Sequence, residues 1–207
     1  SAVITPAVPL LDSTTHPDPA TWVLTNTAAF NWSQPPGDPA AVAGYTWRLD
    51  RAPDTVPHGF NLGPATAHTF HNLADGVWTM HVRAESDGGE WSGAAHRTIR
   101  VDANPPTVQL ALQPASPDGH NGWYVSPVTV VVSATEVLGS GVAGVEVSAD
   151  GVTWQPYAPP LVFTSDTNGA AIYARAVDAV GHVSEPISAT FKIDQTPPDS
   201  HVAGGQG

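Results

Sequence analysis

The stretch VAGYTWRLD, residues 42–50, returns 100 residues later as VAGVEVSAD, residues 142–150. In both copies Val-Ala-Gly opens a run in which every second residue is apolar, and an aspartate closes it. Successive side chains of a β-strand point to opposite faces, so this alternation is typical of a strand with one buried face. The stretch therefore predicts the same strand twice, in two copies of one folding unit.

Other matches keep the same order along the chain. Pro17-Asp18 returns as Pro117-Asp118, and Trp22 returns one position out of step as Trp123. Further on, a shorter loop in the second copy reduces the offset to 92 residues. The later matches are Arg83-Ala84 with Arg175-Ala176, Ser92 with Ser184, Val101-Asp102 with Ile193-Asp194, and Pro105-Pro106 with Pro197-Pro198. Matches that stay in order across a whole unit indicate an internal repeat.

Short alternating runs fill the rest of each copy. They are Phe30 and Trp32 with Val130 and Val132, Trp78 to Ala84 with Ala170 to Ala176, and Ile99 and Val101 with Phe191 and Ile193. We find no sustained helical periodicity, and the 21 prolines and 19 glycines favour strands joined by turns. The pattern predicts an all-β chain of two tandem sandwiches, each of about seven strands. We expect the first sandwich at residues 1–104, the second at 105–198, and a flexible tail or the start of a linker at 199–207.

The composition excludes several classes of function. The formal net charge is −12, and Lys192 is the only lysine. Such a chain repels phosphate backbones and anionic membrane surfaces, so we expect no nucleic-acid partner. Its apolar runs are shorter than the roughly 20 residues that a membrane helix needs, so we expect no membrane insertion. Without cysteine there is neither a disulfide framework nor a thiolate metal site.

Three stretches of the sequence resemble a known family of modules. Phe30–Pro36 resembles the second strand, with its Trp and following prolines, of fibronectin type III-like modules, and Gly44–Asp50 resembles their third strand. Ala176–Ser184 resembles the Asp-x-x-Gly-Asn turn of bacterial immunoglobulin-like repeats, with His182 in place of Asn. The resemblance implies two tandem immunoglobulin-like, fibronectin type III-like sandwiches from a secreted or cell-surface protein. Members of this family share an architecture rather than an activity.

We expect this chain to be a fragment of a larger bacterial or archaeal protein, and not an enzyme. In that setting it would act as a structural spacer that positions neighbouring domains of the same polypeptide. The alternative is an adhesion module that binds a glycan or a cell-surface protein through loop tryptophans or an exposed sheet edge. Sequence motifs for a serine nucleophile, a zinc protease or a phosphate loop do not occur, so no catalytic or cofactor-binding residue is predicted.

The seven tryptophans fall into two groups. Trp32, Trp47 and Trp78 alternate with polar residues on predicted strands, so we expect them to fill the core. The remaining four lie nearer loops and are the candidate ligand residues of a glycan platform: Trp22, Trp91, Trp123 and Trp154. The match of Trp22 with Trp123 favours a shared structural role instead.

Two further groups of side chains raise the question of a metal. Asp102 and Asn104, with Asp18 or Asp118 from a neighbouring loop, offer hard oxygen ligands for a structural calcium ion at the junction. The alternative is that Asp102 and its repeat partner Asp194 accept hydrogen bonds from backbone amides at the turn beside the prolines. The turn at Asp178 is likewise expected to be a brace in which the side chain bonds to the backbone. For the nine histidines we expect scattered surface positions, His81 among them on an outward strand face.

Overall fold

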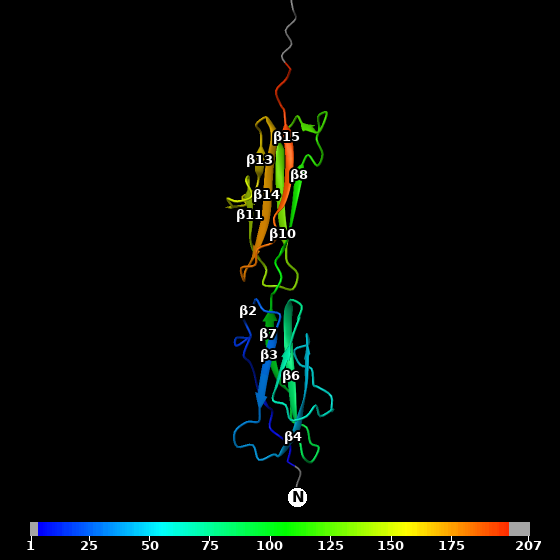
Figure 1. Ribbon diagram of the computed structural model, residues 1–207. Coiled ribbons are helices and arrows are strands. Elements are labelled where there is room, and N and C mark those ends of the chain that lie inside the picture. The colour runs from blue at the N-terminus through cyan, green and yellow to red at the C-terminus, as the bar shows by residue number, and fades with distance from the viewer. Residues whose placement is uncertain (1–3, 199–207) are drawn as a thin grey trace, which may run out of the picture. The chain divides into compact units, whose positions relative to one another are not determined.

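The computed structural model describes residues 4–198, which form two compact units (Figure 1). The first takes in residues 4–104 and the short segment Val137–Ser140, and the second takes in residues 105–136 and 141–198. The tail predicted at residues 199–207 lies outside the described residues. Within residues 4–198 the chain contains no helix with the length and apolar character needed to cross a membrane.

Strands β1 to β7 build the first unit. They are β1 (Leu10–Ser13), β2 (Trp22–Val23), β3 (Ala28–Ser33), β4 (Val42–Asp50), β5 (Ala67–Phe70), β6 (Gly76–Ser86) and β7 (Ala95–Val101). One sheet has the order β1-β3-β5 and the other the order β2-β7-β6-β4. All neighbouring strands are antiparallel except β2 and β7, which run parallel and place Trp22 opposite Arg100.

Strands β8 to β15 repeat this order in the second unit. They are β8 (Thr107–Gln113), β9 (Trp123–Tyr124), β10 (Val128–Thr135), β11 (Val142–Ser148), β12 (Gln155–Pro156), β13 (Leu161–Phe163), β14 (Thr167–Asp178) and β15 (Ile187–Ile193). The sheets have the orders β13-β10-β8 and β12-β11-β14-β15-β9, and β9 runs parallel to β15. Two sheets with this strand order are the immunoglobulin-like, fibronectin type III-like sandwich, so the predicted fold class is confirmed.

Each sandwich has a core of its own. The first core is built around Phe30, Trp32, Met80 and Ile99, with Trp47 and Trp78 half-buried against it. The second is built around Val128, Val130, Ile172, Ala174, Phe191 and Ile193. The two clusters share no residue, and both follow the predicted alternation because one face of every strand turns inward.

The repeated Val-Ala-Gly has a structural meaning. The pairing of β4 with β6 shifts register between Val42 and Gly44, and the pairing of β11 with β14 shifts register between Val142 and Gly144. Both copies therefore carry an irregularity of the bulge type at the start of the same strand.

The matched serines also make the same bonds. Ser92 Oγ accepts the Ala84 amide at 2.9 Å, and Ser184 Oγ accepts the Ala176 amide at 2.9 Å. In each copy the backbone amide of the serine donates back to the same alanine, again at 2.9 Å. The repeat read from the sequence is therefore a repeat of hydrogen bonds as well as of residues.

Candidate functional site

Each of the four tryptophans proposed for a glycan platform has a cationic side chain from a neighbouring strand over its ring, and two of the four, Trp22 and Trp123, lie in the short strands β2 and β9 instead of in loops. The cationic group lies 5.5 Å from the ring centre for Arg100 on Trp22, Arg83 on Trp91 and Lys192 on Trp123, and 4.2 Å for Arg175 on Trp154. All four indoles are half-buried. A cation held over an aromatic face is attracted by the ring quadrupole, so these contacts stabilise the strands that supply them.

The two copies use equivalent cations for this purpose. Trp22 lies opposite Arg100 in the parallel pair of β2 and β7, and Trp123 lies opposite Lys192 in the parallel pair of β9 and β15. This register gives Trp22 and Trp123 equivalent positions in their sandwiches, as a shared structural role requires. Lys192 thus contacts an indole from the outer face of β15, between two inward-facing neighbours.

Arg83 and Arg175 are likewise repeat partners, 92 residues apart, although their tryptophans come from different loops. Arg175 also donates from Nε to Glu146 Oε2 at 2.6 Å, which fixes the guanidinium plane above Trp154. A sugar would stack on an open aromatic face, and in each of these indoles one face is already covered. The glycan platform remains a prediction, in which a sugar could use only the uncovered face of each indole.

The residues proposed for calcium make hydrogen bonds within their own unit, some to the backbone and some to side chains. Asp102 is fully buried, and its Oδ2 accepts the Ser140 amide at 2.8 Å. Asn104 donates from its side-chain amide to Asp75 Oδ2 at 2.8 Å. Asp18 accepts the Ala20 amide and the Thr21 hydroxyl, which hold its pKa below the ordinary value of an aspartate. Only the contacts of Asp18 are local to its own turn, since Asp102 bonds an amide 38 residues away and Asn104 bonds a side chain 29 residues away.

Asp118, the acid that corresponds to Asp18 in the second copy, also accepts a bond in its own turn, from the Val125 amide at 2.7 Å. A side-chain bond from Ser126, followed by the Val125 amide, holds the pKa of Asp118 below its ordinary value. Calcium binding at Asp102 and Asn104 stays a prediction.

A loop carboxylate fastens the chain where it leaves each sandwich. In the first unit, Asp75 accepts the Ala103 amide at 2.7 Å in addition to the Asn104 side chain. In the second, Asp166 accepts the Gln195 amide at 2.7 Å and the Thr196 hydroxyl. These two bonds, the amide first, hold the pKa of Asp166 below its ordinary value. Sequence reasoning missed both acids, although each lies in the loop or turn before the same strand of its copy.

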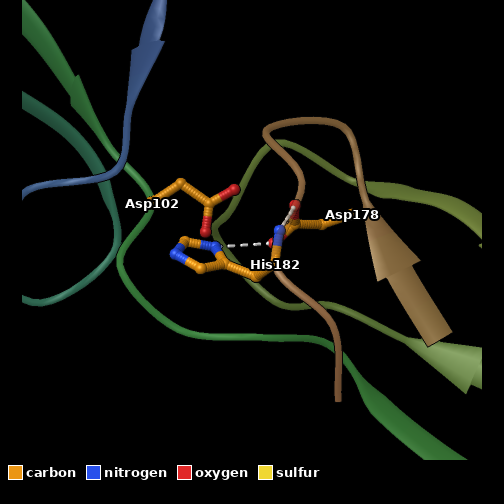
Figure 2. Close-up of side chains that lie close together, drawn as sticks. All are labelled: Asp102, Asp178 and His182. Carbon is orange, nitrogen blue, oxygen red and sulfur yellow. Dashed lines mark hydrogen bonds and ion pairs between the residues drawn. The ribbon is translucent and has the colours of Figure 1, made fainter. Parts of the chain in front are cut away.

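The turn at Asp178 is a side-chain brace, as the sequence predicts. Its Oδ1 accepts the amides of Val180, Gly181 and His182 at 3.0, 2.7 and 2.8 Å. The ring of His182 turns back toward the same carboxylate, with Nδ1 at 2.9 Å from Oδ2 (Figure 2). His182, which stands where the similar repeats have Asn, therefore contacts the Asp178 carboxylate through both its amide and its ring.

The expectation of scattered surface histidines is wrong for His16 and His81. Both side chains are fully buried. His81 does point outward from its sheet, but the segment that follows β4 lies over that face: Pro57 accepts a bond from Arg83, and His58 accepts one from Thr46. A period-2 pattern identifies the face of a strand and not what a distant loop places on top of it.

His81 lies in a row of polar side chains. Its Nε2 is 3.2 Å from Asp50 Oδ1, and its Nδ1 is 2.7 Å from Nδ1 of the exposed His96. Burial lowers the pKa of His81, and this effect outweighs the neighbouring carboxylate. Burial also raises the pKa of Asp50, but bonds from Thr55, Ala52 and His81 outweigh it, so that pKa lies below its ordinary value. The row therefore holds an ionised Asp50 and a neutral His81 near pH 7.

A groove of about 430 Å³ lies on the second unit, over strands β8 and β10. Its lining is Val108, Gln109, Leu110, Ala111, Val131, Ser133 and Ile187. One amide and one hydroxyl are its polar side chains, so this groove supplies no acid–base pair for catalysis.

No family model and no curated protein matches the chain. Among solved structures, the fibronectin(III)-like modules of Clostridium thermocellum CbhA are 14% identical, cover 93% of this chain and 100% of theirs, and have a TM-score of 0.36. The FN1-FN3 domains of chicken CNTN1 are 13% identical over 92% of this chain and 67% of theirs, with a TM-score of 0.43. The D00-D0 domain of Intimin is 11% identical over 89% of this chain and 100% of its own, with a TM-score of 0.41.

The strand order of each unit identifies the fold independently of these similarities. Both units are fibronectin type III-like sandwiches. Because such sandwiches support many unrelated roles, the function has to be argued from the contacts described above.

Proposed function

We propose that this chain is a non-catalytic accessory region of a larger protein, in which it spaces and positions neighbouring domains. The observation that carries this proposal is the parallel pairing of β2 with β7 and of β9 with β15. Because an early strand and the last strand of each sandwich run in the same direction, the chain enters a sandwich at one end and leaves it at the other. Each unit therefore advances the polypeptide by the length of its strands.

The long strands give the scale of that advance. β6 has 11 residues and β14 has 12 residues. At about 3.3 Å per residue, strands of this length span roughly 36–40 Å. A module of this kind separates whatever precedes it from whatever follows it by a fixed increment.

The exit carboxylates support the same role. Asp75 and Asp166 hold the residues just before each Pro-Pro pair against the body of their own unit. Proline in turn restricts the following backbone to a narrow range of φ and removes a backbone donor. A chain that leaves under two such restraints keeps its direction better than a flexible linker, which is what a spacer requires.

A secreted or cell-surface location in a bacterium or archaeon belongs to this proposal. Its support is the resemblance of Phe30–Pro36, Gly44–Asp50 and Ala176–Ser184 to modules of such proteins. The partners are then neighbouring domains of the same polypeptide. The competing proposal is adhesion to a glycan or a cell-surface protein, and the cations that cover Trp22, Trp91, Trp123 and Trp154 argue against it.

A fluorescence titration separates the two proposals. The chain is titrated with a panel of polysaccharides and cell-surface glycans while tryptophan emission is followed. A spacer leaves the emission unchanged across the panel. Saturable quenching that Trp91→Ala or Trp154→Ala abolishes, and that the control Trp78→Phe retains, would establish adhesion and overturn the spacer. Trp78 is the control because it packs against the core and Arg51.

Single-molecule pulling from the two ends tests the spacer directly. We expect two separate unfolding events, each lengthening the chain by roughly 300 Å, since about 95 residues extend at up to 3.6 Å each from a folded length of some 40 Å. If the chain extends without two separate force peaks, its units do not hold a fixed length under load, and the proposal is rejected.

A further inference from the structure

His81 and His96 face each other across two neighbouring strands of the first unit. They are direct partners in the antiparallel pairing of β6 with β7. Side chains at such paired positions leave the same face of the sheet only about 5 Å apart. Here the two rings meet at their Nδ1 atoms, 2.7 Å apart, with ring centres 5.0 Å apart and planes at 75°.

Asp50 fixes the orientation and the tautomer of the buried ring. Besides His81, this carboxylate accepts the Thr55 hydroxyl at 2.9 Å and Nε of Arg48 at 2.9 Å. An ionised carboxylate only accepts hydrogen bonds, so the proton of the neutral His81 ring lies on Nε2 and the lone pair lies on Nδ1. His96 then donates its Nδ1 proton to that lone pair and keeps Nε2 toward solvent.

We propose that His81 and His96 bind a divalent transition-metal ion of the Zn²⁺, Ni²⁺ and Cu²⁺ class between their Nδ1 atoms. Neutral imidazole is the protein ligand that suits these ions. A ligating histidine almost always donates its other ring proton to a carboxylate or carbonyl, and His81 already makes this bond to Asp50. The two Nδ1 atoms face each other, and the buried ring is oriented by the Asp50 carboxylate, so the pair supplies two of the ligands that such an ion needs.

The ion replaces the proton that the two rings share. Two nitrogens bound at about 2.0–2.1 Å in a tetrahedral site lie about 3.4 Å apart, so the rings must separate by roughly 0.7 Å. His96 is exposed and can make that movement, while His81 is buried and held in place. On binding, the Nδ1 proton of His96 moves through solvent to its own Nε2, so both rings remain neutral imidazole ligands and no net proton is released. Water completes the coordination on the solvent side.

The other histidines whose ring contacts the structure gives meet different groups. His16 and His71 contact the hydroxyls of Thr15 and Thr27, His68 packs on Trp47 and Phe70, and His182 contacts Asp178. His71 is exposed and lies in the same unit, so it provides a matched control for His96.

The test is a calorimetric titration of the untagged chain with Cu²⁺, Ni²⁺ and Zn²⁺, with Mg²⁺ as the hard-ion comparison. We expect one saturable site for each of the three transition ions, no site for Mg²⁺, and a loss of at least tenfold in affinity in His96→Ala. His71→Ala should retain the affinity. Asp50→Asn, which keeps both ligands but removes the charge that orients His81, should weaken binding by about 10–100-fold. Thermal melting of each variant verifies that the first unit is folded.

Electron paramagnetic resonance of the Cu²⁺ complex identifies the ligands. The wild-type spectrum should show two equivalent nitrogens, reduced to one or none in His96→Ala. Binding that persists in His96→Ala with an unchanged spectrum overturns the assignment. The absence of any saturable site in the wild-type chain overturns it as well.

Discussion

Ile193→Ala should unfold the second sandwich at a much lower temperature and leave the first unchanged. Ile193 is fully buried and belongs to the second core, which shares no residue with the first. The substitution removes three buried carbon atoms, worth about 2.4 kcal/mol at 0.8 kcal/mol each, and leaves a cavity that costs about 1 kcal/mol more. For a sandwich of about 95 residues, a loss of some 3.5 kcal/mol lowers Tm by roughly 15–25 °C.

Differential scanning calorimetry measures both sandwiches in one experiment. Val101→Ala is the matched substitution in the first unit, since Val101 is fully buried at the corresponding position of β7, and it assigns the other transition. Val152 is 79% exposed, so Val152→Ala should change the free energy of unfolding of neither sandwich by more than about 0.5 kcal/mol. If Ile193→Ala lowers both transitions equally, the two interiors are one cooperative core and the reasoning fails.

Three other outcomes follow from the described contacts. Burial lowers the folded-state pKa of His81, so as pH falls the unfolded chain binds a proton before the folded chain does. The melting temperature of the first unit should therefore fall as pH drops below about 6.5. A melting temperature that stays constant from pH 7.5 to 5.5 would contradict this. Asp75→Ala should speed hydrogen exchange of the Ala103 amide about tenfold or more, and equal rates in both proteins would exclude the exit restraint. Arg175→Ala should destabilise the second unit by about 1–2 kcal/mol and shift Trp154 emission to longer wavelength, whereas an unchanged spectrum would mean that the cation does not cover the ring.

The sequence predicted the strands well because alternation is a local property. Phe30 and Trp32 were expected on an inward face, and both are almost fully buried. The repeat extended this prediction to the second copy, where Val130 occupies the corresponding place in the core. It also predicted the brace at Asp178, since that side chain reaches amides only two to four residues away.

The candidate site was harder to predict because its contacts span large separations in sequence. His81 meets Asp50 across 31 residues, and Asp75 meets Ala103 across 28 residues. The pattern within one strand does not predict such a partner, because the partner depends on which strands become neighbours and at what register. The expectation of a surface position for His81 failed for this reason.

By itself, the sequence determined that the chain repeats one all-β unit and that its strands have an inner and an outer face. Its periodicity suffices for these points, because alternation is a property of residues near one another. Only the tertiary structure decided which cation covers each tryptophan proposed for the glycan platform, which carboxylate fastens each exit, and that two histidines meet above β6 and β7. Such contacts arise when strands distant in sequence pair in one register, and their energy belongs to the folded sandwich and to no single segment of it.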